Sequence, residues 1–129
     1  MLVAALLAHL VGDYVLQSHW MATQKVARWW PAIAHGLTYT LPFVLITQSP
    51  LALLVIGGTH IVLDHYRVAK YVIWAKNLVA PKEHRASLAE AVKNQGFPAS
   101  VPAGLATALL IVVDNTMHLV INAAAITWL

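Results

Sequence analysis

The chain has 129 residues, is 60% hydrophobic and only 10% charged, and has a mean hydropathy of +0.69. Soluble domains carry about 25% charged residues, so the composition excludes an ordinary soluble domain. With no cysteine, the sequence also excludes disulfides, thiolate nucleophiles and sulfur ligands to a metal.

Four apolar segments are long enough, or nearly so, to cross a bilayer, which takes about 20 residues. They predict an all-α fold, a bundle of four transmembrane helices forming a single integral membrane domain over residues 1–129. The predicted spans cover about 1–17, 31–47, 51–68 and 102–129. The first lacks a basic leader and a cleavage site, so we expect it to be retained as a span.

Prolines and small residues shape these segments. Pro42 is expected to kink the second span, and Ser49 to cap the third with Pro50 at its first position. Small residues let neighbouring membrane helices approach closely. The candidates for such contacts are Ala32, Gly36, Gly57, Gly58, Gly104 and Ala108.

A polar region separates the third and fourth spans. In it, Ser87 and Glu90 have capping-box spacing and Gly96 is a C-terminal stop, which predicts a short amphipathic helix. We expect this helix on the cytoplasmic surface, where lysines meet anionic lipid head groups. A solvated loop is the alternative.

The basic residues predict the topology. All eight lie in or beside the connections after spans one and three, and the connection "TQSP" between spans two and three has none. The positive-inside rule makes the basic side cytoplasmic and places both termini outside. The pI near 9.5 therefore reflects membrane orientation and not nucleic-acid binding. The predicted location is the bacterial inner membrane, with a phage-encoded protein also compatible.

Three His/Asp pairs stand four residues apart, which places both side chains on one face of a helix. They are His9/Asp13, His60/Asp64 and Asp114/His118. The order reverses in the fourth span, which runs in the opposite direction, so all three pairs are expected to point the same way. By helix rise, His35 falls level with the aspartates.

These seven residues predict a metal site. A charged aspartate at the centre of a bilayer costs at least about 2.5–3.5 kcal/mol, so each must be neutralised inside the bundle. Histidine and aspartate without cysteine suit zinc first, and also manganese or iron, as one ion or two. The alternative is that the pairs only hold the helices together. We expect Gln17 and Asn122 to support the ligands, and His19, His65 and His84 to be ordinary polar residues.

The stretches "AHLVGDYVLQSHWMA", "AHG", "THIVLDHYRVAK" and "DNTMHLV" resemble a family of small bacterial and phage integral membrane proteins described as a domain of unknown function. The resemblance covers nearly the whole chain and implies no activity. More loosely, the His-x-x-x-Asp motifs look like those of membrane-bound metal-dependent hydrolases of the YdjM type. Both resemblances favour the same seven residues as functional positions.

The leading hypothesis is a metal-dependent hydrolase that acts on a lipid or lipid-linked phosphate ester. An aspartate (Asp13, Asp64 or Asp114) would serve as general base, and Arg67 with Lys70 would bind the substrate. A transport protein for metal ions or protons is the second hypothesis, because intramembrane ionisable residues also mark ion pathways. The third is a non-enzymatic membrane interaction module. The expected partners are the lipid bilayer and anionic head groups, and a homo-oligomer is compatible.

Overall fold

The computed structural model describes all residues 1–129. It contains helices and no strands, which confirms the all-α prediction. The α-helices are α1 (Leu2–Leu10), α2 (His19–Gln24), α3 (Trp29–Thr40), α4 (Pro50–Tyr66), α5 (Val68–Asn77), α6 (Leu88–Lys93) and α7 (Ala103–Trp128). A π-helix, η1 (Val11–Val15), continues α1, and two 3₁₀ helices are η2 (Leu41–Leu45) and η3 (Lys82–His84).

The chain divides into two compact units. The first is Met1–Tyr66 with His118–Leu129, and the second is Arg67–Met117, so α7 begins in the second unit and ends in the first. The prediction that residues 1–129 form one domain stays a prediction.

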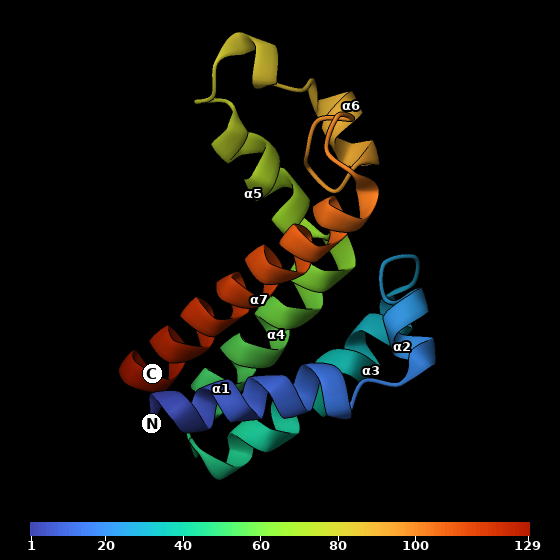
Figure 1. The fold of residues 1–129 in the computed structure, drawn as a ribbon. Coiled ribbons are helices and arrows are strands. Elements are labelled where there is room, and N and C mark those ends of the chain that lie inside the picture. Colours follow the sequence, from blue (N-terminus) through green and yellow to red (C-terminus); the bar gives the residue numbers. More distant parts are fainter. The chain divides into compact units, whose positions relative to one another are not determined.

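The first unit surrounds a small apolar core in which Tyr39, Phe43 and Ile56 are fully buried. Its two chain termini lie close together (Figure 1). At the same end, Ser49 Oγ donates to the carbonyl of Leu129 at 2.9 Å and accepts from the Ala52 N–H, as expected of the residue that caps α4.

Helices α3 and α4 touch through their backbones. A Cβ at Gly57 would lie 2.5 Å from Thr40 Oγ1, and a Cβ at Gly36 would lie 3.3 Å from the Gly57 carbonyl oxygen. The predicted role of these two glycines in close packing is confirmed. Gly58 and Gly104 differ, because a Cβ at either position would meet nothing within 4 Å.

Two helices of the first unit change their winding. At η1 the Leu16 N–H donates to the Val11 carbonyl at 2.9 Å, an i to i+5 bond. Gly12 permits the accompanying close approach, since a Cβ there would lie 2.7 Å from the Tyr39 carbonyl oxygen. In α3, the expected break at Pro42 takes the form of a tighter 3₁₀ turn that begins at Leu41.

The second unit contains the predicted short helix, α6. Ser87 Oγ accepts the Glu90 N–H at 3.2 Å, which confirms one half of the capping box. The Glu90 carboxylate instead accepts the Ala99 N–H at 2.9 Å, so the reciprocal half does not form. Gly96 follows the helix with a φ of +95°, a left-handed conformation that suits glycine.

Helix length does not support four membrane spans. By length and composition, only α7, with 26 residues, is long and apolar enough to cross a membrane. The first predicted span is the shorter apolar helix Leu2–Val15, and the second and third contain α-helices of 12 and 17 residues. The segments are as apolar as expected, but π and 3₁₀ turns end the first two α-helices early.

Candidate metal centre

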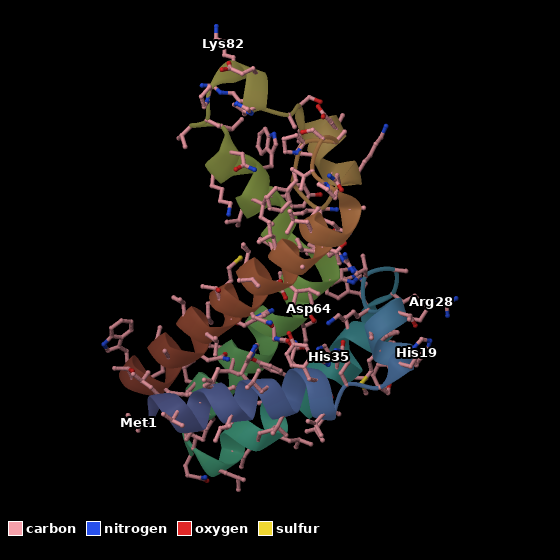
Figure 2. The ribbon with its side chains drawn as sticks, viewed as in Figure 1. Met1, His19, Arg28, His35, Asp64 and Lys82 are labelled. Carbon is pink, nitrogen blue, oxygen red and sulfur yellow. The ribbon has the colours of Figure 1, made fainter.

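Four predicted ligands converge inside the first unit. Asp13 comes from the π-helix η1, His35 from α3, and His60 with Asp64 from successive turns of α4. Both histidines are fully buried and both aspartates are 6% exposed. In Figure 2 the labelled His35 and Asp64 lie close together, while the labelled His19 points away from them.

The facing atoms are two histidine nitrogens and two carboxylate oxygens. His35 Nε2 lies 2.9 Å from His60 Nε2, 3.1 Å from Asp13 Oδ1 and 3.4 Å from Asp64 Oδ2. His60 Nε2 lies 3.3 Å from Asp64 Oδ2 and 3.8 Å from Asp13 Oδ1. One ligand atom from each of the four residues therefore falls within a sphere small enough for a single ion.

The donor set fits a metal ion. In a tetrahedral zinc site, ligands at 2.0–2.2 Å from the metal stand about 3.3–3.5 Å apart, and the five measured separations bracket that value, from 2.9 to 3.8 Å. Both rings face the carboxylates through Nε2, the atom that would coordinate. Their Nδ1 atoms are buried without a hydrogen-bond partner, so the second hydrogen bond that metal-binding histidines usually make is missing here. The cluster can hold a metal ion.

Both carboxylate oxygens of Asp64 also contact residues outside the four-residue group. His118, from the end of α7 that belongs to this unit, places Nε2 3.2 Å from Asp64 Oδ1. Lys25, from the loop between α2 and α3, donates to Asp64 Oδ2 at 2.5 Å. Asp64, on α4, therefore contacts residues from α7, from the α2–α3 loop and from α3.

Tyr39 links the outer residues to the centre. Asn122 Nδ2 donates to Tyr39 Oη at 2.6 Å, and Tyr39 Oη lies 2.8 Å from His9 Nδ1. The Tyr39 ring stacks on the His60 ring, with centroids 3.6 Å apart and 11° between the planes. This contact orients His60, as residues around metal sites commonly orient the ligand rings.

His9 and His118 stand beside the four-residue group and not within it. His9 Nε2 is 4.0 Å from Asp13 Oδ2, and His118 reaches the Asp64 oxygen that faces away from the two histidines. Gln17 supports η1, because its Nε2 donates to the Asp13 carbonyl at 2.7 Å. The structure thus places four of the seven predicted ligands in one group and these two histidines around it.

Three further predicted site residues fall in the second unit. Asp114, Arg67 and Lys70 are part of the second unit. There Arg67 has a left-handed backbone with a φ of 49° and donates to Gln95 Oε1 at 3.2 Å, while Lys70 lies over the Tyr71 ring. Their roles as base and substrate ligands stay predictions.

His65 differs from the ordinary polar residue we expected. Its Nδ1 lies 2.8 Å from the Lys25 carbonyl oxygen, and its ring stacks on Trp29 at 3.9 Å between centroids. It therefore fastens the α2–α3 loop to α4. His19 and His84 are exposed, as expected.

Sequence reasoning missed Lys25 and Tyr39. Lys25 is one of the basic residues that predict the topology, and nothing in its loop distinguishes it from Arg28. Tyr39 did carry a signal, since it lies four residues after His35 and thus on the same helix face.

A comparison with models of protein families tests whether the chain belongs to a known family. The model of the family described as "Protein of unknown function (DUF3307)" matches residues 1–129. The chain belongs to this family. Neither the curated proteins nor the solved structures gave a match. DUF3307 membership confirms the resemblance to a family of unknown function, and the looser likeness to YdjM-type hydrolases gains no support.

Proposed function

We propose that this DUF3307 protein is an integral membrane metalloprotein whose His35/His60/Asp13/Asp64 centre hydrolyses a lipid or lipid-linked phosphate ester. The observation that carries the proposal is the convergence of four buried ligand atoms from three helices. Lys25 pairs with Asp64, whereas the ion-pair partners of Asp13 are the histidines His9, His35 and His60. A divalent ion would neutralise both buried carboxylates at once. Zinc suits two imidazoles and two carboxylates, and manganese or iron(II) suits them as well.

The distribution of polar groups supports a membrane location. The buried set includes His9, His35, His60, His118 and Asn122, each at most 1% exposed. Large apolar side chains face outward instead: Leu45 is 90% exposed, and α1 and α7 carry many exposed leucines and valines. Contiguous exposed apolar surface of this kind marks contact with lipid or protein. With the polar face inward and the apolar face outward, the helices suit a bilayer.

The residues of the centre have different roles in the proposed hydrolysis. A divalent ion would supply a Lewis acid that polarises a phosphoryl oxygen and activates water. Asp64 is engaged through both oxygens, by His118 and by Lys25. Asp13 Oδ2, in contrast, has a nearest ion-pair distance of 4.0 Å, to His9. We therefore assign Asp13 as the general base, acting through Oδ2. The ion would then be held by His35, His60 and Asp64, with one position left for water.

The polar region of residues 76–101, which contains α6, is proposed to lie at the cytoplasmic membrane surface. On and before α6, exposed cations stand next to exposed apolar side chains: Lys82, Arg85 and Lys93 alongside Leu88 and Val92. Such a mixture favours an anionic lipid surface.

Elemental analysis tests the metal centre. We expect protein purified in detergent without chelator to carry at least one transition metal ion per chain. Replacing one ligand, in His35→Ala or His60→Ala, should sharply reduce the occupancy, because the remaining residues cannot complete the coordination. His84→Ala, which alters an exposed histidine in η3, is the matched control and should keep the metal.

A metal-free wild type would refute the metalloprotein and with it the hydrolase. For the reaction itself, metal-loaded protein should release phosphate from a lipid-linked phosphate ester in mixed micelles. Chelator and Asp13→Asn should each stop the release.

A second candidate is transport of protons or metal ions. It is favoured by an unbroken series of close polar contacts through the first unit, from Asn122 through Tyr39 and His9 to Asp13, His35, His60, Asp64 and Lys25. Ion flux into proteoliposomes that stops in His35→Ala would select this function. Full function after all four central residues become apolar would instead select a non-enzymatic interaction module.

A further inference from the structure

Lys25 enters the candidate metal centre from outside the helices. Its Nζ donates to Asp64 Oδ2, the same oxygen that lies 3.4 Å from His35 Nε2 and 3.3 Å from His60 Nε2. The ammonium group thus stands beside the ligand atoms themselves.

The main chain of Lys25 is held in place from α4. Its carbonyl oxygen lies 2.8 Å from His65 Nδ1, and the His65 ring stacks on Trp29, the first residue of α3. A lysine whose only role was to set the membrane topology would not need these contacts. They hold the main chain of Lys25 in a defined position beside α4.

Lys25 is also more exposed than the four residues of the centre. Its side chain is 16% exposed, compared with 9% for Asp13, 4% for Asp64 and none for His35 and His60. Of these five side chains, Lys25 therefore offers the largest exposed fraction to a ligand from outside.

Formal charges show what such a ligand must be. Asp13 and Asp64 contribute two negative charges, which one divalent ion balances. Lys25 then contributes one positive charge in excess, and its carboxylate partner is shared with the metal. A buried or half-buried excess charge needs a counter-ion. The centre with its metal is complementary to an anion.

We propose that Lys25 binds the anionic group of the ligand, a phosphate or phosphate ester, beside the metal ion. The proposal rests on the proposed metal centre and names a substrate contact within it. A phosphate offers several oxygens, so it can reach the metal and the ammonium together, and lysine is a common point-charge ligand for phosphate.

Binding measurements on metal-loaded protein test this assignment. The probes are inorganic phosphate and a short-chain phosphatidic acid, each titrated into wild type, Lys25→Gln and Lys76→Gln, with metal content measured on the same samples. Lys76 is the matched control, because it is an exposed lysine on α5. We expect Lys25→Gln to keep the metal and to bind the probe about 10- to 100-fold more weakly, the effect of one hydrogen bond to a charged group. Lys76→Gln should bind as wild type does.

The two probes separate the sources of the phosphate group. Phosphatidic acid binding without inorganic phosphate binding assigns the site to a lipid head group, and binding of both assigns it to phosphate in general. Binding of neither probe by metal-loaded wild type overturns the proposal.

A footprint on the wild type covers the case in which Lys25→Gln does not fold. An amine-reactive reagent should modify Lys25 more slowly when the probe is present, while modification of Lys76 stays the same. Lys25→Arg, which keeps the charge, should retain part of the probe affinity.

The outcomes separate this proposal from the proposed function. Metal-loaded Lys25→Gln that binds phosphate as tightly as wild type, or a Lys25 footprint unchanged by the probe, refutes the role of Lys25 and leaves the metal centre standing. A metal-free wild type refutes both.

Discussion

Tyr39→Phe removes one oxygen from the support of the centre and keeps the ring that stacks on His60. Tyr39 Oη accepts from Asn122 at 2.6 Å and lies 2.8 Å from His9 Nδ1, and all three residues are at most 1% exposed. Two interhelical hydrogen bonds at an average of about 0.6 kcal/mol each contribute about 1.2 kcal/mol. A buried donor that loses its acceptor, here Asn122 Nδ2, costs about 1–3 kcal/mol. We therefore expect the free energy of unfolding to fall by about 1–3 kcal/mol.

The assay is unfolding by SDS in mixed micelles, followed by tryptophan fluorescence. Tyr66→Phe is the matched control, because Tyr66 is 54% exposed, and its effect should stay within about 0.5 kcal/mol. The double variant with Asn122→Ala should cost less than the sum of the single variants, since both remove the same bond. A Tyr39→Phe protein as stable as Tyr66→Phe would show that the hydroxyl does not support the centre.

Three further predictions concern packing, metal and topology. Gly57→Ala should destabilise the protein by about 1–3 kcal/mol in the same SDS titration, because its Cβ would meet Thr40 Oγ1 at 2.5 Å. The neighbouring Gly58→Ala, with open space around its Cβ, should be neutral or stabilising. Equal changes in stability for the two variants would contradict the close contact at Gly57. Removing metal with a chelator should lower the free energy of unfolding by about 2.7 kcal/mol relative to metal at 100 times its Kd, and a chelator effect that persists in His60→Ala would place the ion elsewhere. Single cysteines at Ser49, Lys82 and Lys93, in a chain with no cysteine of its own, should react with an impermeant reagent from outside the cell only at position 49; labelling of position 82 from outside would reverse the predicted orientation.

The centre was predictable from sequence to the extent that it depends on helix periodicity. His60 and Asp64 lie one turn apart on an unbroken α-helix, so their spacing alone placed them together. The level of His35 was predicted by counting the helix rise back from residue 47, although α3 ends at Thr40 and the chain continues as a 3₁₀ helix to Leu45. Capping residues were equally local signals, and Ser49 and Ser87 both accept the expected N–H groups.

The contacts that depend on tertiary structure were not predictable. Lys25 reaches Asp64 across 39 residues of sequence, and no local pattern separates it from Arg28. Span lengths were overestimated because hydropathy measures composition and not winding: residues 11–15 and 41–45 are as apolar as their neighbours and still leave the α-helix.

The π-helix at Val11–Val15 makes the first helix sensitive to insertion and deletion as well as to substitution. A π turn holds one residue more than the α turn it replaces. Deleting a single apolar residue such as Val11 would let the segment return to α-helical winding, and the flanking residues would keep their orientation because the turn loses the one residue that it held in excess. Gly12 and Asp13 lie inside the turn, so the deletion would change the winding that presents them to Tyr39 and His35, their partners on α3. Chain length in this segment is therefore under the same structural constraint as the ligands, although the deleted residue bears no functional group.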